Sequence, residues 1–268
     1  MDGLGLGTGG SIGHGGFETV SVALGRGVDS LSIHGTAADV ATTIDTGDGD
    51  DAIQLESARG TLLLQTGRGA DSIVVGDPTD LAVDNDSIQD GLPPREVLAL
   101  VSGMVGSVRI EGGEGADRLR FDDSANTQGG TTAINDLVFV GVGTAPQGVA
   151  FAGVEHLDVT LGTGNDLLVH WDTAATTTVD MGGGRDVLEL FGNHHPLTVR
   201  QTHGGELLAN LGGMVMYRDS ILGGMREQVT LDGGGHAESR LVVRNEGDPA
   251  HNDGVLSATA VTGMGMGV

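Results

Sequence analysis

The sequence predicts an all-β fold: a parallel β-solenoid with coils of about 20 residues and glycine-rich G-x-G-x-D turns along one edge. Three observations predict it: a recurring glycine turn, apolar residues that alternate around each turn, and very little aromatic bulk. The 268 residues include 49 Gly but only one Trp, one Tyr and five Phe. Such a composition excludes a large aromatic core and suits a thin one.

Short strands are predicted on both sides of each glycine turn, because apolar residues there alternate with period two. Before the first turn, for example, the apolar residues are Val20, Val22 and Leu24. The one helix candidate is REVLALVSGM, which begins at Arg95. A β-sandwich is the alternative architecture, and the fixed phase of the glycines favours the solenoid.

Stacked coils would superpose equivalent apolar residues about 4.8 Å apart. We expect Val22, Ile44 and Leu64 to form one interior row. We expect the equivalent place in later coils to be held by Ile110, Val159 and Val179.

The G-x-G-x-D motif occurs six times, and the first glycines of neighbouring copies lie 22, 20, 46, 49 and 20 residues apart. The candidate site residues are the two glycines and the aspartate of each copy: Gly25, Gly27, Asp29; Gly47, Gly49, Asp51; Gly67, Gly69, Asp71; Gly113, Gly115, Asp117; Gly162, Gly164, Asp166; Gly182, Gly184, Asp186.

A longer period contains this short one. The segment FETVSVALGRGVDSLSIHG matches VEHLDVTLGTGNDLLVHW with Gly25 on Gly162, an offset of 137 residues. The chain is therefore predicted to be a tandem duplication, with copy one at residues 1–130 and copy two at 131–268. Because the terminal LSATAVTGMGMGV resembles LVFVGVGTAPQGV, which leads into copy two, we expect a fragment of a longer array.

The glycine turns suggest calcium chemistry. G-x-G allows positive φ angles and inward carbonyl oxygens, and the aspartate adds a carboxylate. Calcium takes 6 to 8 oxygen ligands, which one turn cannot supply and two stacked turns can. The expected intercoil Ca²⁺ sites pair Asp29 with Asp51, Asp51 with Asp71, and Asp166 with Asp186, whereas Asp117 is separated from its neighbours by longer inserts.

Some features weigh against every turn being a cation site. Arg26, Arg68 and Arg185 place a positive charge inside the motif unless they point outward, and THGGE at Thr202 and GGGHAE at Gly233 have lost the aspartate. In the alternative interpretation, G-x-G-x-D is only a tight turn whose aspartate bonds its own backbone.

The motifs TGDGDDAIQ, TGRGADSIV and GGEGADRLR resemble the calcium-binding repeats-in-toxin (RTX) nonapeptide G-G-x-G-x-D-x-U-x. LGTGND also resembles loops of a calcium-dependent bacterial ice-binding adhesin domain. This resemblance implies a bacterial protein secreted without an amino-terminal signal, folded by calcium outside the cell, and used in an adhesin, a stalk or a toxin.

Charge and composition exclude several other classes. The net charge is −24 with no Lys, which disfavours nucleic acid and anionic membranes as partners. There is no Cys and no run of about 20 apolar residues. His34 and His170 follow equivalent turns in the two copies, one residue apart at the offset of 137, and His194 and His195 form no motif, so we expect no active site.

The expected function is thus a non-enzymatic, calcium-binding structural module of an extracellular or cell-surface protein. Its expected partners are calcium ions, neighbouring repeats of the same chain or fibre, and cell-surface glycan or protein ligands. The alternatives are a β-helix polysaccharide-active enzyme and a carbohydrate- or ice-binding solenoid.

Overall fold

The computed structural model describes residues 14–76, 103–141, 144, 146–212, 225–235, 238–245, 253–263 and 266. These residues form strands joined by turns and connections, with no α-helix among them, which confirms the all-β class. The helix candidate that begins at Arg95 lies outside the described residues as far as Ser102. Within the described part of the chain, no helix is long and apolar enough to cross a membrane.

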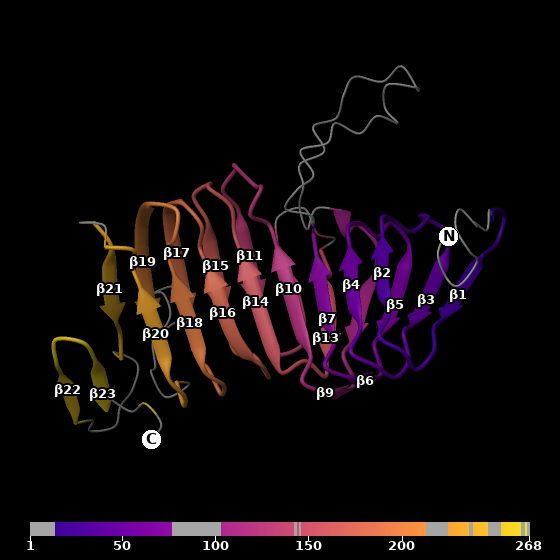
Figure 1. The fold of residues 1–268 in the computed structure, drawn as a ribbon. Helices are drawn as coiled ribbons and strands as arrows, with labels where there is room; N and C mark the ends of the chain where they lie inside the picture. Colours follow the sequence, from indigo (N-terminus) through magenta and orange to yellow (C-terminus); the bar gives the residue numbers. More distant parts are fainter. Residues whose placement is uncertain are drawn as a thin grey trace, which may run out of the picture.

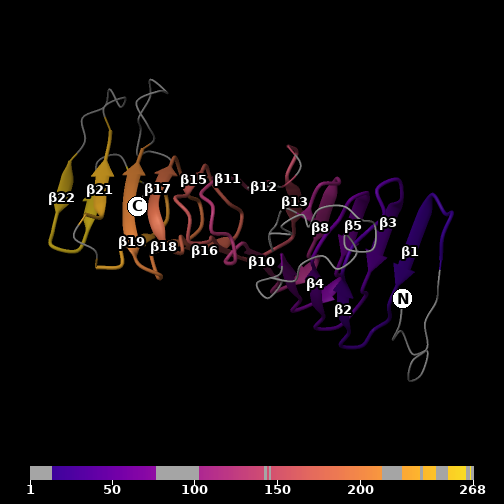
Figure 2. The same ribbon diagram turned by 90° about the horizontal axis from the view of Figure 1, so that it is seen from above.

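Two facing sheets contain most of the described strands (Figures 1 and 2). The long sheet has the order β1 (Thr19–Ala23), β3 (Ala41–Asp45), β5 (Thr61–Gln65), β8 (Val108–Glu111), β13 (Val149–Ala152), β12 (Val138–Val140), β11 (Thr131–Ile134), β15 (Leu167–His170), β17 (Gly184–Leu190), β19 (Gly205–Leu211) and β21 (Arg240–Val243). The short sheet has the order β2 (Ser30–Ile33), β4 (Ala52–Leu55), β7 (Ser72–Val75), β10 (Arg118–Asp122), β14 (His156–Thr160), β16 (Thr176–Asp180), β18 (Leu197–Arg200) and β20 (Val229–Asp232).

Strand pairing is parallel throughout the short sheet and through most of the long sheet, as predicted. Consecutive strands alternate between the sheets, so the partners within one sheet come from successive repeats. Two further pairs are small: the two-residue strands β6 (Arg68–Gly69) and β9 (Glu114–Gly115) within glycine turns, and the hairpin of β22 (Gly254–Leu256) with β23 (Val261–Gly263).

Inward side chains of both sheets form one continuous apolar core. In the long sheet Val22 pairs with Ile44, Ile44 with Leu64, and Leu64 with Ile110, which is the predicted interior row. The predicted place of Val159 and Val179 is wrong. They pair with each other in the short sheet, where Phe121 precedes them.

A three-strand meander interrupts the alternation in the middle of the chain. β11 and β12 pair antiparallel, β12 and β13 pair antiparallel, and all three lie in the long sheet. In the short sheet β10 pairs directly with β14. Bulky side chains fill the core beside the added strands: Phe121 stacks on Phe139 with ring centroids 4.0 Å apart, and Phe151 lies 6.3 Å from Phe121.

The meander also changes which sheet each copy enters first. β1 belongs to the long sheet, whereas its sequence equivalent in copy two, β14, belongs to the short sheet. β10 and β14 both lie in the short sheet, with the meander of the long sheet between them, so the part of copy two that aligns with β1 begins in the opposite sheet. Equivalent glycine turns therefore run from long to short sheet in copy one and from short to long sheet in copy two.

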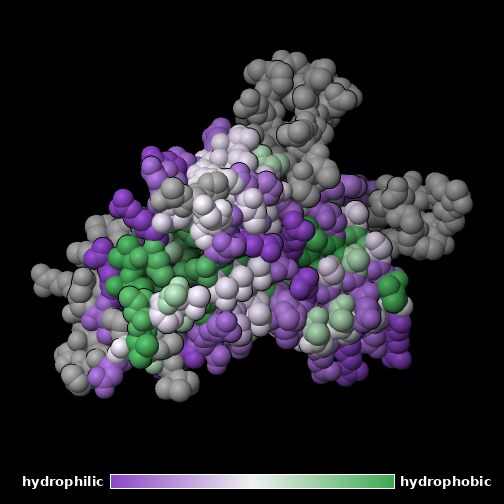
Figure 3. All heavy atoms as spheres, turned by 60° about the vertical axis from the view of Figure 1, so that its left-hand side comes forward, coloured by the Kyte–Doolittle hydropathy of each residue, from purple (hydrophilic) through white to green (hydrophobic). Residues whose placement is uncertain are grey.

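Several apolar side chains are exposed near the carboxyl-terminal strands. In Figure 3, apolar side chains gather on the left, around this end of the sheets. Leu241 at the edge strand β21 is 53% exposed, and Val255 and Leu256 of the hairpin are 65% and 81% exposed.

Candidate metal-binding turns

The six motif turns form two columns, not the single edge that the sequence predicts. Column one comprises the turns at 25–29, 47–51, 67–71 and 113–117, each running from the long to the short sheet. Column two comprises the turns at 162–166 and 182–186, which run in the opposite sense. In Figure 1, column one lies along the lower edge, where β6 and β9 are labelled, and column two lies beyond the arrowheads of β14 and β16.

Glycine is required in each turn that stacks on a preceding turn, because the two turns lie in close contact. A Cβ atom at Gly67, whose φ is +88°, would lie 1.9 Å from the carbonyl oxygen of Gly47. In column two, a Cβ atom at Gly182 (φ +74°) would lie 1.8 Å from the carbonyl oxygen of Gly162. The first glycine of one turn thus occupies space beside the carbonyl of the turn before it, which only glycine can do.

The motif aspartates of column one connect one turn to the next. The backbone N–H of Asp29 donates to Oδ1 of Asp51 (2.8 Å), and that of Asp51 donates to Oδ1 of Asp71 (2.8 Å). Asp117 continues the series, because the N–H of Asp71 donates to its Oδ1 (2.9 Å). The long insert before Asp117 therefore leaves the register intact, and Asp117 belongs with the others.

Sequence reasoning missed one member of the series, Glu155. It follows Gly153 and Val154 in the short connection between β13 and β14, which lacks the motif. Its Oε2 accepts the N–H of Asp117 (2.8 Å), in the same way as the motif aspartates accept the N–H before them. The only sequence signal was an acidic residue immediately before a strand that aligns with β1.

Each interior aspartate of column one uses one carboxylate oxygen and leaves the other without a donor. Asp51, Asp71 and Asp117 are 2%, 1% and 0% exposed, and Oδ2 of each has no hydrogen-bond partner. Burial raises the pKa of Asp71 and of Asp117, and neighbouring carboxylates of the same column act in the same direction. Buried carboxylate oxygens without donors are costly unless a cation or a proton neutralises them.

Hydroxyl groups accompany the carboxylates in column one. Thr46 and Thr66 directly precede the first glycines of two turns and are fully buried. Thr46 Oγ1 donates to the carbonyl of Thr66 (3.2 Å), and Thr66 Oγ1 donates to that of Gly112 (2.7 Å). Their remaining lone pairs, like those of the turn carbonyls, are possible cation ligands.

Column two is shorter and has different neighbours. Asp166 Oδ1 accepts the N–H of Gly130 (2.9 Å), and Asp186 Oδ1 accepts the N–H of Asp166 (2.8 Å). Oδ2 of Asp186 accepts a hydrogen bond from Gln201 Nε2 (2.7 Å), whereas Oδ2 of Asp166 has no partner. Burial raises the pKa of Asp166, and it raises the pKa of Asp186 to about 6. The next residue in register is Leu207, so the carboxylates end there.

The three motif arginines point outward and place no charge inside the turns. Arg26 is 89% exposed and lies 3.6 Å from Asp48, and Arg68 Nε lies 3.0 Å from Glu114 Oε2. Arg185 Nε lies 2.8 Å from Glu206 Oε2. Arg26 and Arg68, the middle residues of their G-x-G motifs, therefore pair with their counterparts in the next turn on the outer surface, and Arg185, which follows the second glycine of its turn, pairs with Glu206 in register.

These residues fit a calcium ion only if the backbone supplies much of the coordination. Within the described ranges, no three His, Cys, Asp or Glu side chains converge as a cluster of metal ligands. The turn carbonyls, however, each retain a lone pair: Gly25 and Gly47, for example, accept one N–H each from the following turn. The donor set is thus entirely oxygen, with one anionic oxygen per turn, which is the chemistry that calcium prefers.

The side-chain contacts of His34, His170 and His194 lie outside the motif turns, whereas the backbone N–H of His156 donates to the carbonyl of Asp117 (3.0 Å) and that of His203 donates to the carbonyl of Gly182 (2.8 Å). His34 Nδ1 and Glu56 Oε2 are 2.6 Å apart on the edge opposite column one. Asp172 and His194 form a similar pair in copy two; burial opposes ionisation of Asp172, but hydrogen bonds from His194 outweigh it and lower the pKa of Asp172. His170 is fully buried, and burial lowers its pKa, so it is neutral. These pairs connect neighbouring repeats.

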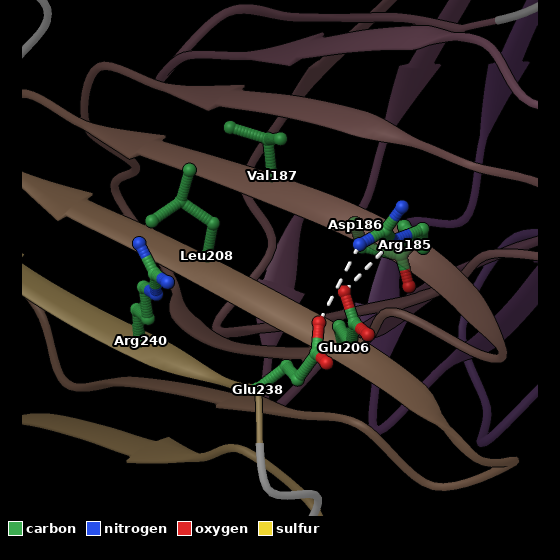
Figure 4. A pocket seen from close by; sticks show the side chains of 7 residues that line it. All are labelled: Arg185, Asp186, Val187, Glu206, Leu208, Glu238 and Arg240. Atoms are coloured by element: carbon green, nitrogen blue, oxygen red, sulfur yellow. Dashed lines mark hydrogen bonds and ion pairs between the residues drawn. The ribbon is translucent and has the colours of Figure 1, made fainter.

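A shallow hollow of about 350 Å³ lies on the outer surface of β17 and β19 (Figure 4). Val187 and Leu208 form its apolar wall, and Arg185 contacts both Glu206 and Glu238, the latter at 3.6 Å. These three charged side chains pair with one another across neighbouring strands, so the hollow is the site of a surface ion-pair network.

No protein-family model matches the chain, and no curated protein or solved structure matches it either. Its function is therefore inferred from the chemistry of the site itself.

Proposed function

We propose that the chain is a calcium-stabilised structural module, a parallel β-solenoid whose two sheets are the walls of one continuous coil. Calcium would bind between successive glycine turns, held by motif carboxylates and turn carbonyls. The observation that carries the proposal is the row of buried, in-register aspartates in column one, each with an oxygen that lacks a donor.

The whole-molecule charge supports a role for cations in folding. A chain of net charge −24 repels itself when compact, and the repulsion is strongest where carboxylates stack in successive coils. Binding to the folded state alone would stabilise it by about 2.7 kcal/mol when free calcium is 100 times its Kd.

The resemblance of the turns to RTX repeats supports an extracellular or cell-surface location, where calcium is abundant. In that setting the module would extend or display another part of an adhesin, a stalk or a fibre. Its partners would be calcium, adjoining repeats, and surface glycans or proteins.

A calcium titration of the chelator-stripped chain tests the proposal. Calcium is expected to increase the strand signal in far-ultraviolet circular dichroism and to raise the melting temperature, while magnesium and sodium chloride at matched ionic strength do much less. The double variant Asp71→Asn, Asp117→Asn should lose most of this response. The matched control Asp39→Asn, Asp136→Asn, which removes two exposed charges, should keep it.

A stripped chain that is already fully folded, and whose spectrum and melting temperature ignore calcium, would show that the turns are structural turns only. An equal response from the two double variants would show that calcium acts on general charge and not at the motif.

A further inference from the structure

We propose that calcium binds along column one and not along column two, and that Glu155 is the last carboxylate ligand of column one. This inference rests on the proposed function and assigns its sites, including one residue outside the G-x-G-x-D motif. Three differences between the columns support it: the length of the carboxylate series, the residue before the first glycine, and the presence of an amide partner.

Column one has carboxylates in five successive turns, at Asp29, Asp51, Asp71, Asp117 and Glu155. Each adjoining pair could share a cation, with one carboxylate from each turn. The three interior aspartates are at least 98% buried, and each has an oxygen without a donor. No described arginine pairs with these three carboxylates, so a bound cation or a proton must offset their buried charge.

Glu155 ends the series through its longer side chain. Its connection has three residues, Gly153 to Glu155, where the motif has five, so its Cα lies in a shorter turn. The backbone N–H of Glu155 donates to the carbonyl of Asp117 (3.1 Å), while its own carboxylate accepts the N–H of Asp117 (2.8 Å). Glu155 is exposed, so an ion between it and Asp117 would be at the accessible end of the column.

The side chains before the first glycines differ in chemistry. Column one has the buried hydroxyls of Thr46 and Thr66 there. Column two has Leu161 and Met181, which are 3% and 0% exposed and offer no oxygen ligand. A calcium ion in column two would therefore have fewer oxygens within reach.

Column two also satisfies its last carboxylate without a cation. Gln201 Nε2 donates to Oδ2 of Asp186 (2.7 Å), which is the atom that lacks a donor in the column-one aspartates. Leu207 follows in register, so no further carboxylate could complete a site. Of the two motif aspartates in column two, only Asp166 keeps an oxygen without a hydrogen-bond partner, so column two lacks the row of such motif carboxylates that column one has.

The test is calcium binding by equilibrium dialysis and calorimetry on the full chain, comparing Glu155→Gln, Asp71→Asn and Asp186→Asn. Glu155→Gln keeps an oxygen that can accept the Asp117 N–H but removes the charge, so the fold should persist. We expect Glu155→Gln to lose one site or to weaken it on the order of tenfold, because calcium affinity follows ligand charge. Asp71→Asn should lose more, and Asp186→Asn should bind calcium as the natural chain does.

Glu155→Asp provides a second readout, because it keeps the charge and shortens the reach. Weakened binding in Glu155→Asp as well as Glu155→Gln would support direct ligation, whereas unchanged binding in both would refute the role of Glu155. A loss of bound calcium in Asp186→Asn equal to that in Asp71→Asn would overturn the assignment to column one. If the natural chain binds no calcium, the proposed function itself fails. Melting curves in chelator would identify any variant that is simply unfolded.

Discussion

Within one five-residue turn, glycine and aspartate solve different physical problems. The first glycine permits close approach of the neighbouring turn, as the 1.9 Å separation between a Cβ at Gly67 and the carbonyl of Gly47 indicates. The aspartate then ties that turn to the next through a backbone N–H, and its second oxygen remains available. The motif is therefore a stacking device even without a cation, and the proposed cation binding would be added to it.

The stacking role of glycine can be measured by alanine substitution. Gly67→Ala should lower the free energy of unfolding by about 1–3 kcal/mol or more, because alanine at φ +88° is strained and its Cβ meets a backbone carbonyl. Gly27→Ala is the matched control: it has no atom within 4 Å of a built Cβ, so a change within about 0.5 kcal/mol is expected by urea unfolding. Equal effects at both positions would contradict the close-contact explanation.

Asp186 should make stability depend on pH when calcium is absent. Its pKa is about 6 in the folded chain and 3.8 as the ordinary value, so between these pH values the folded state holds a proton that the unfolded state has lost. Stability should therefore fall as pH rises from about 4 to 6, by about 3 kcal/mol for this group.

Asparagine at position 186 would remove this dependence, so Asp186→Asn should be more stable than the natural chain at pH 7 and lose its advantage near pH 4. Urea unfolding at several pH values, with a chelator present, measures the stability of the natural chain and of Asp186→Asn at each pH. Asp39→Asn is the control for an exposed carboxylate. If the stability of the natural chain rises steadily from pH 4 to 6, paired carboxylates elsewhere in the chain dominate the pH dependence.

At the scale of elements, the sequence predicts most of what repetition can reveal. Alternating apolar residues and glycine turns predicted the all-β class, the parallel pairing and the row from Val22 to Ile110. They could not predict that Glu155 joins the carboxylates of column one, because Glu155 lies in a connection that has no G-x-G-x-D motif. They also could not place Val159 and Val179, because period two is the same in either sheet and only the meander decides which sheet a strand enters.

The meander depends on its aromatic contacts. Phe121 is fully buried between Phe139 and Phe151, so Phe121→Ala should cost about 3–5 kcal/mol through lost burial and a cavity. Phe17→Ala, at a residue that is 58% exposed, should cost far less. Urea unfolding measures both variants. A small cost at Phe121 would mean that the added strands are held mainly by their backbone hydrogen bonds.

For the whole molecule, the predicted duplication does not correspond to two superposable halves along one edge. Equivalent motifs face opposite edges because the meander shifts the phase, and the two columns then differ in neighbours as well as position. Column one has a longer carboxylate row and buried hydroxyls, whereas column two has apolar neighbours and an amide partner. Most of the buried, unpaired negative charge of the turns is thereby concentrated in copy one.

This distribution predicts that salt and calcium act on stability separately. Sodium chloride should raise the melting temperature of the stripped chain, because the Debye length falls from about 30 Å at 0.01 M to about 3 Å at 1 M and surface repulsion is screened. Buried carboxylates are screened much less, so calcium should still raise the melting temperature in 1 M sodium chloride. Calorimetric melting with and without calcium at both salt concentrations measures the two effects. If the calcium effect disappears in 1 M salt, calcium is only a counter-ion for the acidic surface, and the aspartates of column one act as stacking residues alone.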